Sequence, residues 1–161
     1  MDNLHIRAPR RSSRWIPHHG AQPLGSKMGD VIQMIRKPHE IVERWMELVH
    51  ERELGKILAL YDQNAILIPT FSDSIQNTPE KIGEYFKKLL CRKNLKLTLH
   101  PKTIRTQQLN ALLFVVSGIY QWKFNVEDEL ITYEARFTFV IDITKTSPII
   151  HHHSSQIPRM I

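Results

Sequence analysis

The sequence predicts an α+β domain, in which a strongly curved antiparallel sheet forms a cone-like roll and about three N-terminal helices close its open side. Helical patterns come first in the folded region, and long alternating strand patterns follow them. Gly118 interrupts one of these strand patterns, where a bend needs a residue without a side chain. A curved sheet closed by helices encloses a pocket, which is the usual place for a small ligand.

Residues 1–37 are predicted to be a flexible basic leader, followed by one domain over residues 38–158. The leader contains prolines and glycines without any apolar period. Its basic side chains supply much of the formal net charge of +6 and are Arg7, Arg10, Arg11, Arg14 and Lys27. A basic tail can touch nucleic acid or lipid headgroups, but a solvated tail is the commoner case. We therefore expect no nucleic-acid partner.

The apolar runs and the cysteine count of the sequence bear on the cellular location of the protein. The sequence has neither a long apolar run for a membrane span nor the apolar core of a signal peptide, so no membrane partner is expected. Cys91 is the one cysteine, which excludes an intramolecular disulfide. A reducing, cytoplasmic location is the default.

Three helices are expected before the long strands. The first begins at Pro38 and carries apolar residues at helical spacing as far as about Arg52. A short second helix over residues 54–61 is broken by the polar residues 62–64. The segment 78–90 combines an N-cap hydroxyl, a proline at the first helical position and one apolar stripe, and predicts the third helix.

The remaining segments are predicted to be strands. Residues 65–68 form a buried apolar run that ends at a proline, and residues 95–99 alternate between apolar and polar side chains. Two longer strands are expected over residues 112–124 and 130–143, joined as a hairpin by residues 125–129.

The stretch Ile149–Ser155 is the strongest indication of function. Its three imidazoles and two hydroxyls have no packing reason to follow one another, because apolar residues fill a buried strand better and charged residues solvate a loop better. In a strand, alternate side chains face opposite ways. One face would carry His151, His153 and Ser155, and the other Ile150, His152 and Ser154.

Four blocks of sequence resemble the nuclear transport factor 2-like superfamily, and within it the association domain of calcium/calmodulin-dependent protein kinase II and its stand-alone relatives. The blocks, in order, are Ile68–Ser72, Thr78–Phe86, Tyr133–Val140 and His151–Pro158. The same blocks resemble the iota-class carbonic anhydrases, which share this domain. Relatives usually have a glycine and a tryptophan shortly before HHHSS, whereas residues 147–149 here are Ser-Pro-Ile. This difference alters the final hairpin and leaves the pocket residues in place.

The resemblance implies reversible hydration of carbon dioxide to bicarbonate, without metal or other cofactor. The residues that it marks as catalytic are Thr70, Tyr85, His152 and Ser154, and those that it marks as ligand-binding are Arg136, His151, His153 and Ser155. Hydration needs an aimed water, donors for the bicarbonate oxygens and a proton route. Hydroxyl, guanidinium and imidazole groups meet these needs, and histidine, with a pKa of about 6.5, is the natural proton carrier.

Several of these residues also have a purely structural interpretation. Tyr85 lies on the apolar stripe of its helix and fits the core as well as the pocket. Thr70 follows Pro69 at a strand end, where a turn-forming hydroxyl is common. Arg136 can pair with Glu134 instead of binding an anion.

A zinc site is a less favoured alternative. His151 and His153 share a strand face, but a catalytic zinc needs a third protein ligand. That ligand would have to be His100, His50 or a carboxylate brought in by folding.

Two other functions compete with the carbonic anhydrase hypothesis. The domain could be a non-catalytic module for self-assembly or small-ligand binding, as in the kinase relatives. It could also be an isomerase or dehydratase, which needs a carboxylate base. The candidates for that base are Asp62, Asp73 and Glu134. A homodimer that binds a small molecule or anion is expected in each case. Its contacts would come from Leu112, Phe114, Val116, Trp122 and Phe124.

Overall fold

The computed structural model describes residues 37–158, so the predicted leader, apart from Lys37, lies outside the described residues. The elements, in order, are α2 (Pro38–Glu51), α3 (Leu54–Ala59), β1 (Tyr61–Ile68), α4 (Pro79–Leu90), β2 (Lys96–Leu99), the 3₁₀ turn η1 (Pro101–Thr103), β3 (Arg105–Gln108), β4 (Leu113–Val126), β5 (Glu129–Asp142) and β6 (Ile149–Gln156). Within this part of the chain, no helix has the length and apolar character needed to cross a bilayer.

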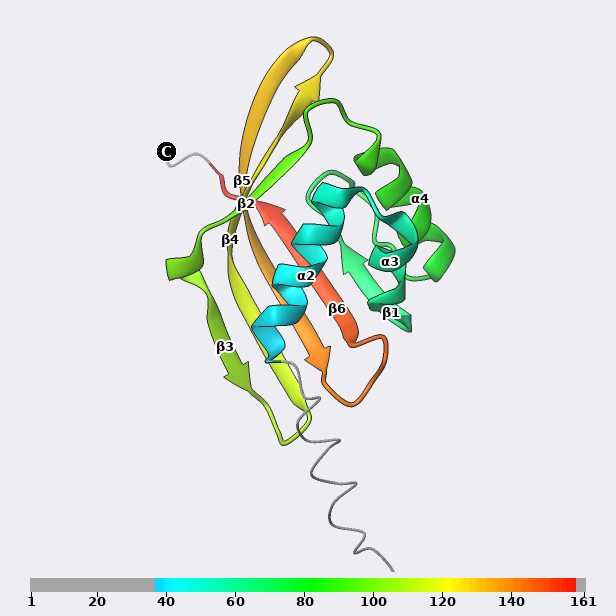
Figure 1. Cartoon of the computed structure of the whole chain (residues 1–161), viewed down its shortest axis with the longest axis vertical. Helices are drawn as coiled ribbons and strands as arrows, with labels where there is room; N and C mark the ends of the chain where they lie inside the picture. The colour runs from blue at the N-terminus through cyan, green and yellow to red at the C-terminus, as the bar shows by residue number, and fades with distance from the viewer. Residues whose placement is uncertain (1–36, 159–161) are drawn as a thin grey trace, which may run out of the picture.

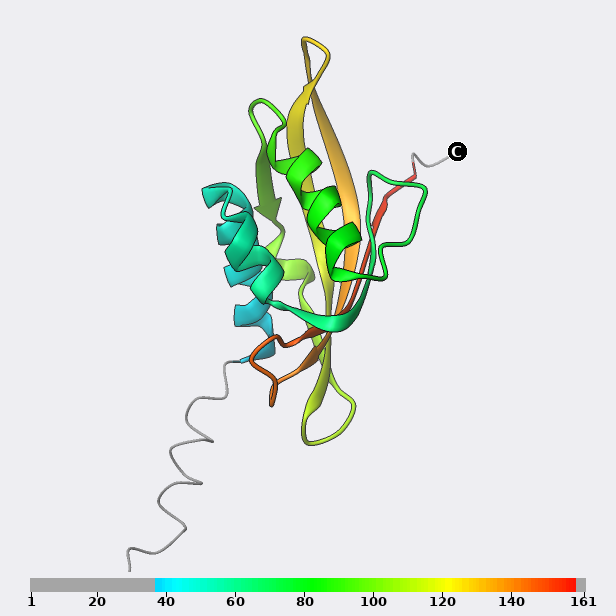
Figure 2. The ribbon, with the colours of Figure 1, turned by 90° about the vertical axis from the view of Figure 1, so that its right-hand side faces the viewer.

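The strands form one sheet that curls without closing. Its order is β1-β6-β5-β4-β2, and β3 pairs with β4 beyond the end of β2. Only the β1–β6 pair is parallel among the described strands. The three α-helices lie on one side of this sheet, and the β4–β5 hairpin extends beyond them (Figures 1 and 2). The predicted α+β cone with three helices is confirmed.

The helices begin where their sequences place a suitable first turn. The Thr78 hydroxyl accepts a hydrogen bond from the Lys81 backbone N–H at 3.3 Å, and proline occupies the first position of both α2 and α4. Each helix then turns an apolar stripe toward the sheet. The buried residues of α2 are Ile41, Val42, Trp45, Met46, Leu48 and Val49, and those of α4 are Ile82, Phe86, Leu89 and Leu90.

The concave face of the sheet supplies the other half of the core. Val116, Tyr120, Trp122 and Phe124 project from β4 toward the helices and are buried. The expectation that Val116, Trp122 and Phe124 form an exposed dimer surface is therefore wrong. The helix-facing side of the long strand, rather than its outer side, carries the large apolar residues.

Gly118 is required by a close contact between β4 and β5. The two strands pair Gly118 with Phe137, and a Cβ on Gly118 would lie only 2.7 Å from the Phe137 ring. The reason for this glycine is thus the close approach of an aromatic ring, in addition to any freedom to bend.

The hairpin connection predicted over residues 125–129 is shorter, since β4 runs to Val126 and β5 begins at Glu129, and the largest differences from the predicted boundaries lie around Tyr61. The second helix ends at Ala59, and Tyr61 together with Asp62–Asn64 belongs to β1. Tyr61 pairs with Ile149 of β6, and an irregular register between Tyr61 and Ile66 accommodates the polar residues. This long-range pairing decides the boundary. The edge strand β3 was not predicted, because all four of its residues are polar and exposed and it has no apolar alternation.

Candidate functional site

Strand β6 delivers one histidine and one serine to the interior. His152 and Ser154 are only 2% and 4% exposed, and they face the helices. Ile149 is buried in place of Ile150, because the register between β5 and β6 shifts at Val140 and Ile141. The prediction that His152 and Ser154 share a face is confirmed, whereas the prediction for Ile150 is wrong.

His152 is held by two tyrosines and an aromatic ring. The Tyr61 hydroxyl lies 2.8 Å from Nδ1 and the Tyr120 hydroxyl lies 3.5 Å from Nε2. The imidazole stacks on Phe139 with ring centres 3.8 Å apart. Burial, with smaller contributions from the two flanking histidines, holds the pKa of His152 well below its ordinary value. His152 is therefore a neutral imidazole near neutral pH.

A chain of hydroxyls continues from His152 toward the helices. The Tyr120 hydroxyl donates to Ser154 Oγ at 2.6 Å, and Ser154 Oγ is hydrogen-bonded to Thr70 Oγ1. The single hydroxyl proton of Tyr120 is donated to Ser154, so toward His152 the Tyr120 oxygen can only act as an acceptor, from Nε2–H. This assigns the tautomer of His152: Nδ1 carries no proton and accepts from the Tyr61 hydroxyl. Thr70 and Ser154 share two hydroxyl protons and use one between them. The other hydroxyl proton of this pair is not used in the bond between Thr70 and Ser154 and can be donated to another group.

The free hydroxyl proton lies beside a small internal cavity. The cavity has a volume of about 10 Å³, enough for a single water molecule. Its lining includes Thr70, Tyr85, His152 and Ser154, so the four residues predicted to be catalytic share one enclosure. Trp45 and Trp122 also line it, and within residues 37–158 neither indole N–H has a hydrogen-bond partner. The hydroxyl groups of Thr70, Tyr85 and Ser154 are the polar groups that this lining offers to an occupant.

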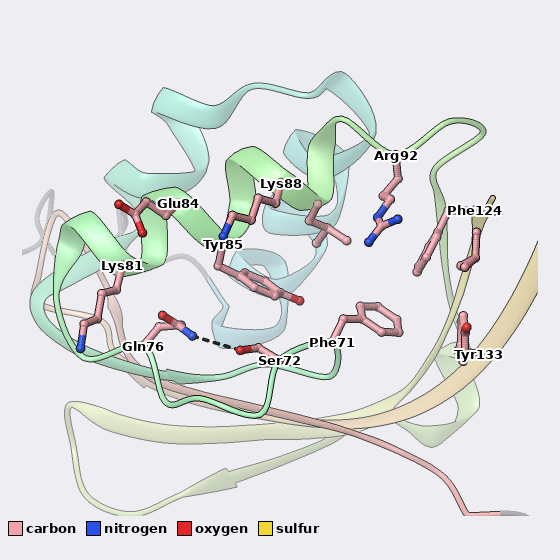
Figure 3. A pocket seen from close by; sticks show the side chains of 12 residues that line it. Phe71, Ser72, Gln76, Lys81, Glu84, Tyr85, Lys88, Arg92, Phe124 and Tyr133 are labelled. Atoms are coloured by element: carbon pink, nitrogen blue, oxygen red, sulfur yellow. Dashed lines mark hydrogen bonds between the residues drawn. The ribbon is translucent and has the colours of Figure 1, made fainter.

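A larger cleft adjoins this cavity. It has a volume of about 340 Å³ and lies between α4, the segment after β1 and the outer part of the β4–β5 hairpin (Figure 3). Tyr85 and Leu89 line both the cleft and the inner cavity, so these two residues separate them. Burial raises the pKa of the Tyr85 hydroxyl, which therefore stays protonated and can donate.

The four residues predicted to bind ligand lie on the other face of the sheet. Arg136 pairs with Ser155 across β5 and β6, and Thr138 pairs with His153 beside it. The sheet separates Arg136, His151, His153 and Ser155 from the inner cavity, and none of them lines it. Glu134 lies 3.4 Å from His100 Nε2 and accepts from Gln121, and within residues 37–158 the alternative ion pair of Glu134 with Arg136 is not formed.

Two alternatives, a zinc site and an isomerase or dehydratase with a carboxylate base, rest on other side chains. Among residues 37–158, no three histidine, cysteine or carboxylate side chains lie together as a metal site would require. His50, a suggested third ligand, instead accepts the Leu97 backbone N–H at 3.0 Å. Asp62 forms an ion pair with Lys145 at 2.7 Å. Neither Asp62, Asp73 nor Glu134 lines the inner cavity, so the carboxylate base of an isomerase or dehydratase is not found there.

Sequence reasoning missed the residues that complete the site. Tyr61 was assigned to the apolar side of a helix, and nothing local indicates that it meets His152. Tyr120 is the one buried residue of β4 that carries a hydroxyl, and its place in the alternating apolar pattern of that strand indicates in the sequence that it faces the interior. The three cations at the cleft are Lys81, Lys88 and Arg92. Their spacing of seven and four residues, which places side chains near one side of a helix, was the sequence signal for this positive charge.

Comparisons with known proteins bear on the fold and the subgroup. No protein-family model matches the chain, and no curated protein matches its sequence. A protein from Xanthomonas campestris that is assigned as a calcium/calmodulin-dependent protein kinase II association domain is 25% identical, with a TM-score of 0.66 over 74% of this chain and 84% of its own.

Two further solved structures share the fold at low identity. A nuclear transport factor 2-like protein with a cystatin-like fold from Novosphingobium aromaticivorans is 8% identical, with a TM-score of 0.64, and covers 88% of this chain and 94% of its own. A ketosteroid isomerase-like protein from Erwinia carotovora atroseptica is also 8% identical, with a TM-score of 0.62, and covers 75% and 94%.

The chain therefore has the cone fold of nuclear transport factor 2-like proteins. Its structural neighbours include an association-domain-like protein, as the four sequence blocks predict, and proteins named after enzymes. The likeness to carbonic anhydrases is a separate hypothesis.

Proposed function

We propose that the protein is a carbonic anhydrase-like enzyme that hydrates carbon dioxide reversibly at the inner cavity. One observation carries the proposal: a buried chain of hydroxyls, oriented by a neutral imidazole, ends at a cavity the size of one water molecule. Hydroxyl groups of Thr70, Ser154 and Tyr85 line this cavity and can both donate to and accept from a water held there. Such a water would be oriented by protein groups rather than by bulk water.

The reaction then proceeds by attack of this water on carbon dioxide. The new bond joins the water oxygen to the carbon, and the electron pair of one C=O bond moves onto its oxygen. The water loses one proton, which leaves bicarbonate. Thr70, Ser154 and Tyr85 are the hydroxyl groups available to orient the water and to donate to the developing oxygen charge.

His152 takes a positioning role in this scheme. Its lowered pKa makes it a poor store for the released proton, in contrast to the proton-carrier role expected from the sequence. The imidazole instead fixes the direction of the Tyr120 hydroxyl, which fixes that of Ser154. The proton leaves to water in the cleft.

The cleft supports entry and exit of small molecules. Carbon dioxide would approach past Tyr85 and Leu89, because these residues line both spaces. Lys81, Lys88 and Arg92 at the cleft attract the bicarbonate anion. We also infer that the enzyme acts in the cytoplasm, where its exposed Cys91 stays reduced.

Stopped-flow hydration of carbon dioxide by the purified full chain, with and without a chelator, tests the proposal. We expect activity that the chelator does not remove, and a loss of about a hundredfold or more in Ser154→Ala. Ser155→Ala is the matched control, because it deletes the neighbouring hydroxyl on the opposite face of the sheet. Activity no higher than buffer, or equal loss in both variants, would refute the proposal.

A self-assembling module is the second candidate, favoured by the likeness to the Xanthomonas protein. The outer side of the sheet has partly exposed apolar residues in register, with Val115 beside Val140, and Ile119 nearby on β4. These residues, rather than the buried Val116, Trp122 and Phe124, would form the contact of a homodimer. Light scattering at micromolar concentration tests this candidate, and a monomer would eliminate it.

A further inference from the structure

The cleft beside the inner cavity is suited to a ligand much larger than carbon dioxide. Its volume of about 340 Å³ falls in the usual range for small-molecule pockets, whereas carbon dioxide and bicarbonate would leave most of it empty. The hydration proposal accounts for the Tyr85 and Leu89 side of the cleft and gives its cations a weak attraction for bicarbonate, but it gives no role to the aromatic residues of the cleft. The remaining wall needs its own explanation.

One side of the cleft is positively charged. Lys81 and Lys88 project from α4, and Arg92 follows the end of this helix (Figure 3). Three cations and the single carboxylate of Glu84 leave a net positive charge. Within residues 37–158, none of the three cations forms an ion pair with a carboxylate. They are available to an anion.

The other side is aromatic. Phe71, Phe124 and Tyr133 come from three different segments, and their ring centres lie 5.0 to 5.6 Å apart. Phe71 meets the other two rings edge to face, and Phe124 and Tyr133 are stacked at 30°. A flat ring can add to such a cluster by the same contacts.

The two sides are close enough to act on one small molecule. The Arg92 guanidinium lies 5.7 Å from the centre of the Phe124 ring, so charge and aromatic surface meet at one end of the cleft. Tyr85 points into the space between α4 and Phe71 (Figure 3). A ligand with a ring against the aromatic residues would place an acidic group a few atoms away beneath α4.

We propose that the cleft is a binding site for a small aromatic anion, whose ring packs on Phe71 and Tyr133, with the buried Phe124 supporting them, and whose charged group is bound by Lys88 and Arg92. The site does not depend on the hydration reaction, because its ring and charge contacts come from residues outside the inner cavity. The geometry selects for the combination of ring and negative charge. The experiment below distinguishes a carboxylate from a phosphate.

The test is a titration of the ¹⁵N-labelled full chain, followed by NMR, with three probes that share one ring. These are 2-naphthoate, 2-naphthyl phosphate and the uncharged 2-naphthalenemethanol. We expect at least one of the anions to bind with a Kd of about 0.1–1 mM, which corresponds to an ordinary binding free energy per non-hydrogen atom of the ligand. Binding should shift the NMR signals of α4 and of the β4–β5 hairpin. The uncharged probe should bind at least about fivefold more weakly.

Two substitutions on one helix provide the matched comparison. Lys88→Gln should weaken binding of the anion about threefold to tenfold, because it removes one of the cations that face the cleft. Lys87→Gln makes the same change at the neighbouring residue, which is exposed and does not line the cleft. It should leave the Kd unchanged. Tyr133→Ala should weaken all three probes, because it removes part of the aromatic wall.

Three results would overturn the inference. The first is no saturable shift with either anion up to 5 mM, roughly fivefold above the expected Kd. The second is equal binding of the uncharged probe, and the third is equal loss in Lys87→Gln and Lys88→Gln. Binding of an anion in a protein that fails to hydrate carbon dioxide would leave this inference intact and remove only the proposed activity.

Discussion

Acid is expected to destabilise the protein through His152. In the unfolded chain this imidazole titrates near its ordinary pKa of about 6.5, whereas burial keeps the folded-state pKa well below that value. Between the two values the unfolded state binds a proton and the folded state does not. The free energy of unfolding therefore falls as the pH drops below about 6.5.

The magnitude follows from this difference in bound protons. A single group of this kind changes the stability by at most about 1.4 kcal/mol for each pH unit. Lowering the pH from 7 to 5 thus removes at most about 2 kcal/mol, because the unfolded imidazole becomes almost fully charged over this interval. His151, whose pKa is also lowered by burial, acts in the same direction. Asp62 and Glu80 have lowered pKa values in the folded protein, so the stability that they contribute is lost only in more acidic solution, as the pH falls below the ordinary pKa of a carboxyl group.

Urea unfolding at pH 7, 6 and 5 measures this effect. With an m-value in the ordinary range, the transition midpoint should fall by roughly 1 M urea between pH 7 and pH 5. His152→Gln should be less stable at pH 7 but should lose most of the pH dependence. His153→Gln makes the same change one residue later on the exposed face, and it should keep most of the dependence. Equal slopes in the wild type and His152→Gln would refute the assignment of a buried, neutral imidazole.

Three further predictions concern the stability of the scaffold, and each is measured by urea unfolding at pH 7. Tyr61→Phe removes the hydroxyl bonded to His152 Nδ1 and should cost about 1–3 kcal/mol; an unchanged midpoint would mean that this bond is absent. Gly118→Ala should cost about 1–3 kcal/mol through its clash, whereas Gly55→Ala, with no atom within 4 Å, should be neutral or stabilising; similar effects at both glycines would contradict the packing. Thr78→Ala should cost about 1 kcal/mol by removing the N-cap of α4, and no loss would show that this cap is dispensable.

The candidate site was predictable in those parts that depend on local alternation. The spacing of His152 and Ser154 places them on one face of a strand, and the T-P-E start of α4 places Tyr85 on its apolar stripe. The same alternation also required His151, His153 and Ser155 to face away. Grouping all of them around one ligand followed from the resemblance, and the strand geometry divides them between the two faces of the sheet.

Tyr61 and Tyr120 show why the rest could not be predicted. They meet His152 from residues 91 and 32 positions away in the chain, and no local pattern records such contacts. The cleft has the same origin, because its cations lie on and just after α4 while its rings come from the loop after β1 and from the β4–β5 hairpin. Only the curling of the sheet around the helices brings these segments together.

The sequence by itself determined the order of the helices and of the apolar strands, the apolar stripe of each helix and the shared face of His152 and Ser154, because these follow from the 3.6- and 2-residue periods of the backbone. The tertiary structure alone decided where α3 ends, which hydroxyls His152 meets and how far its pKa falls. Burial and hydrogen bonding depend on groups that are distant in the chain, and pairing between β1 and β6 outweighs the local helical preference around Tyr61.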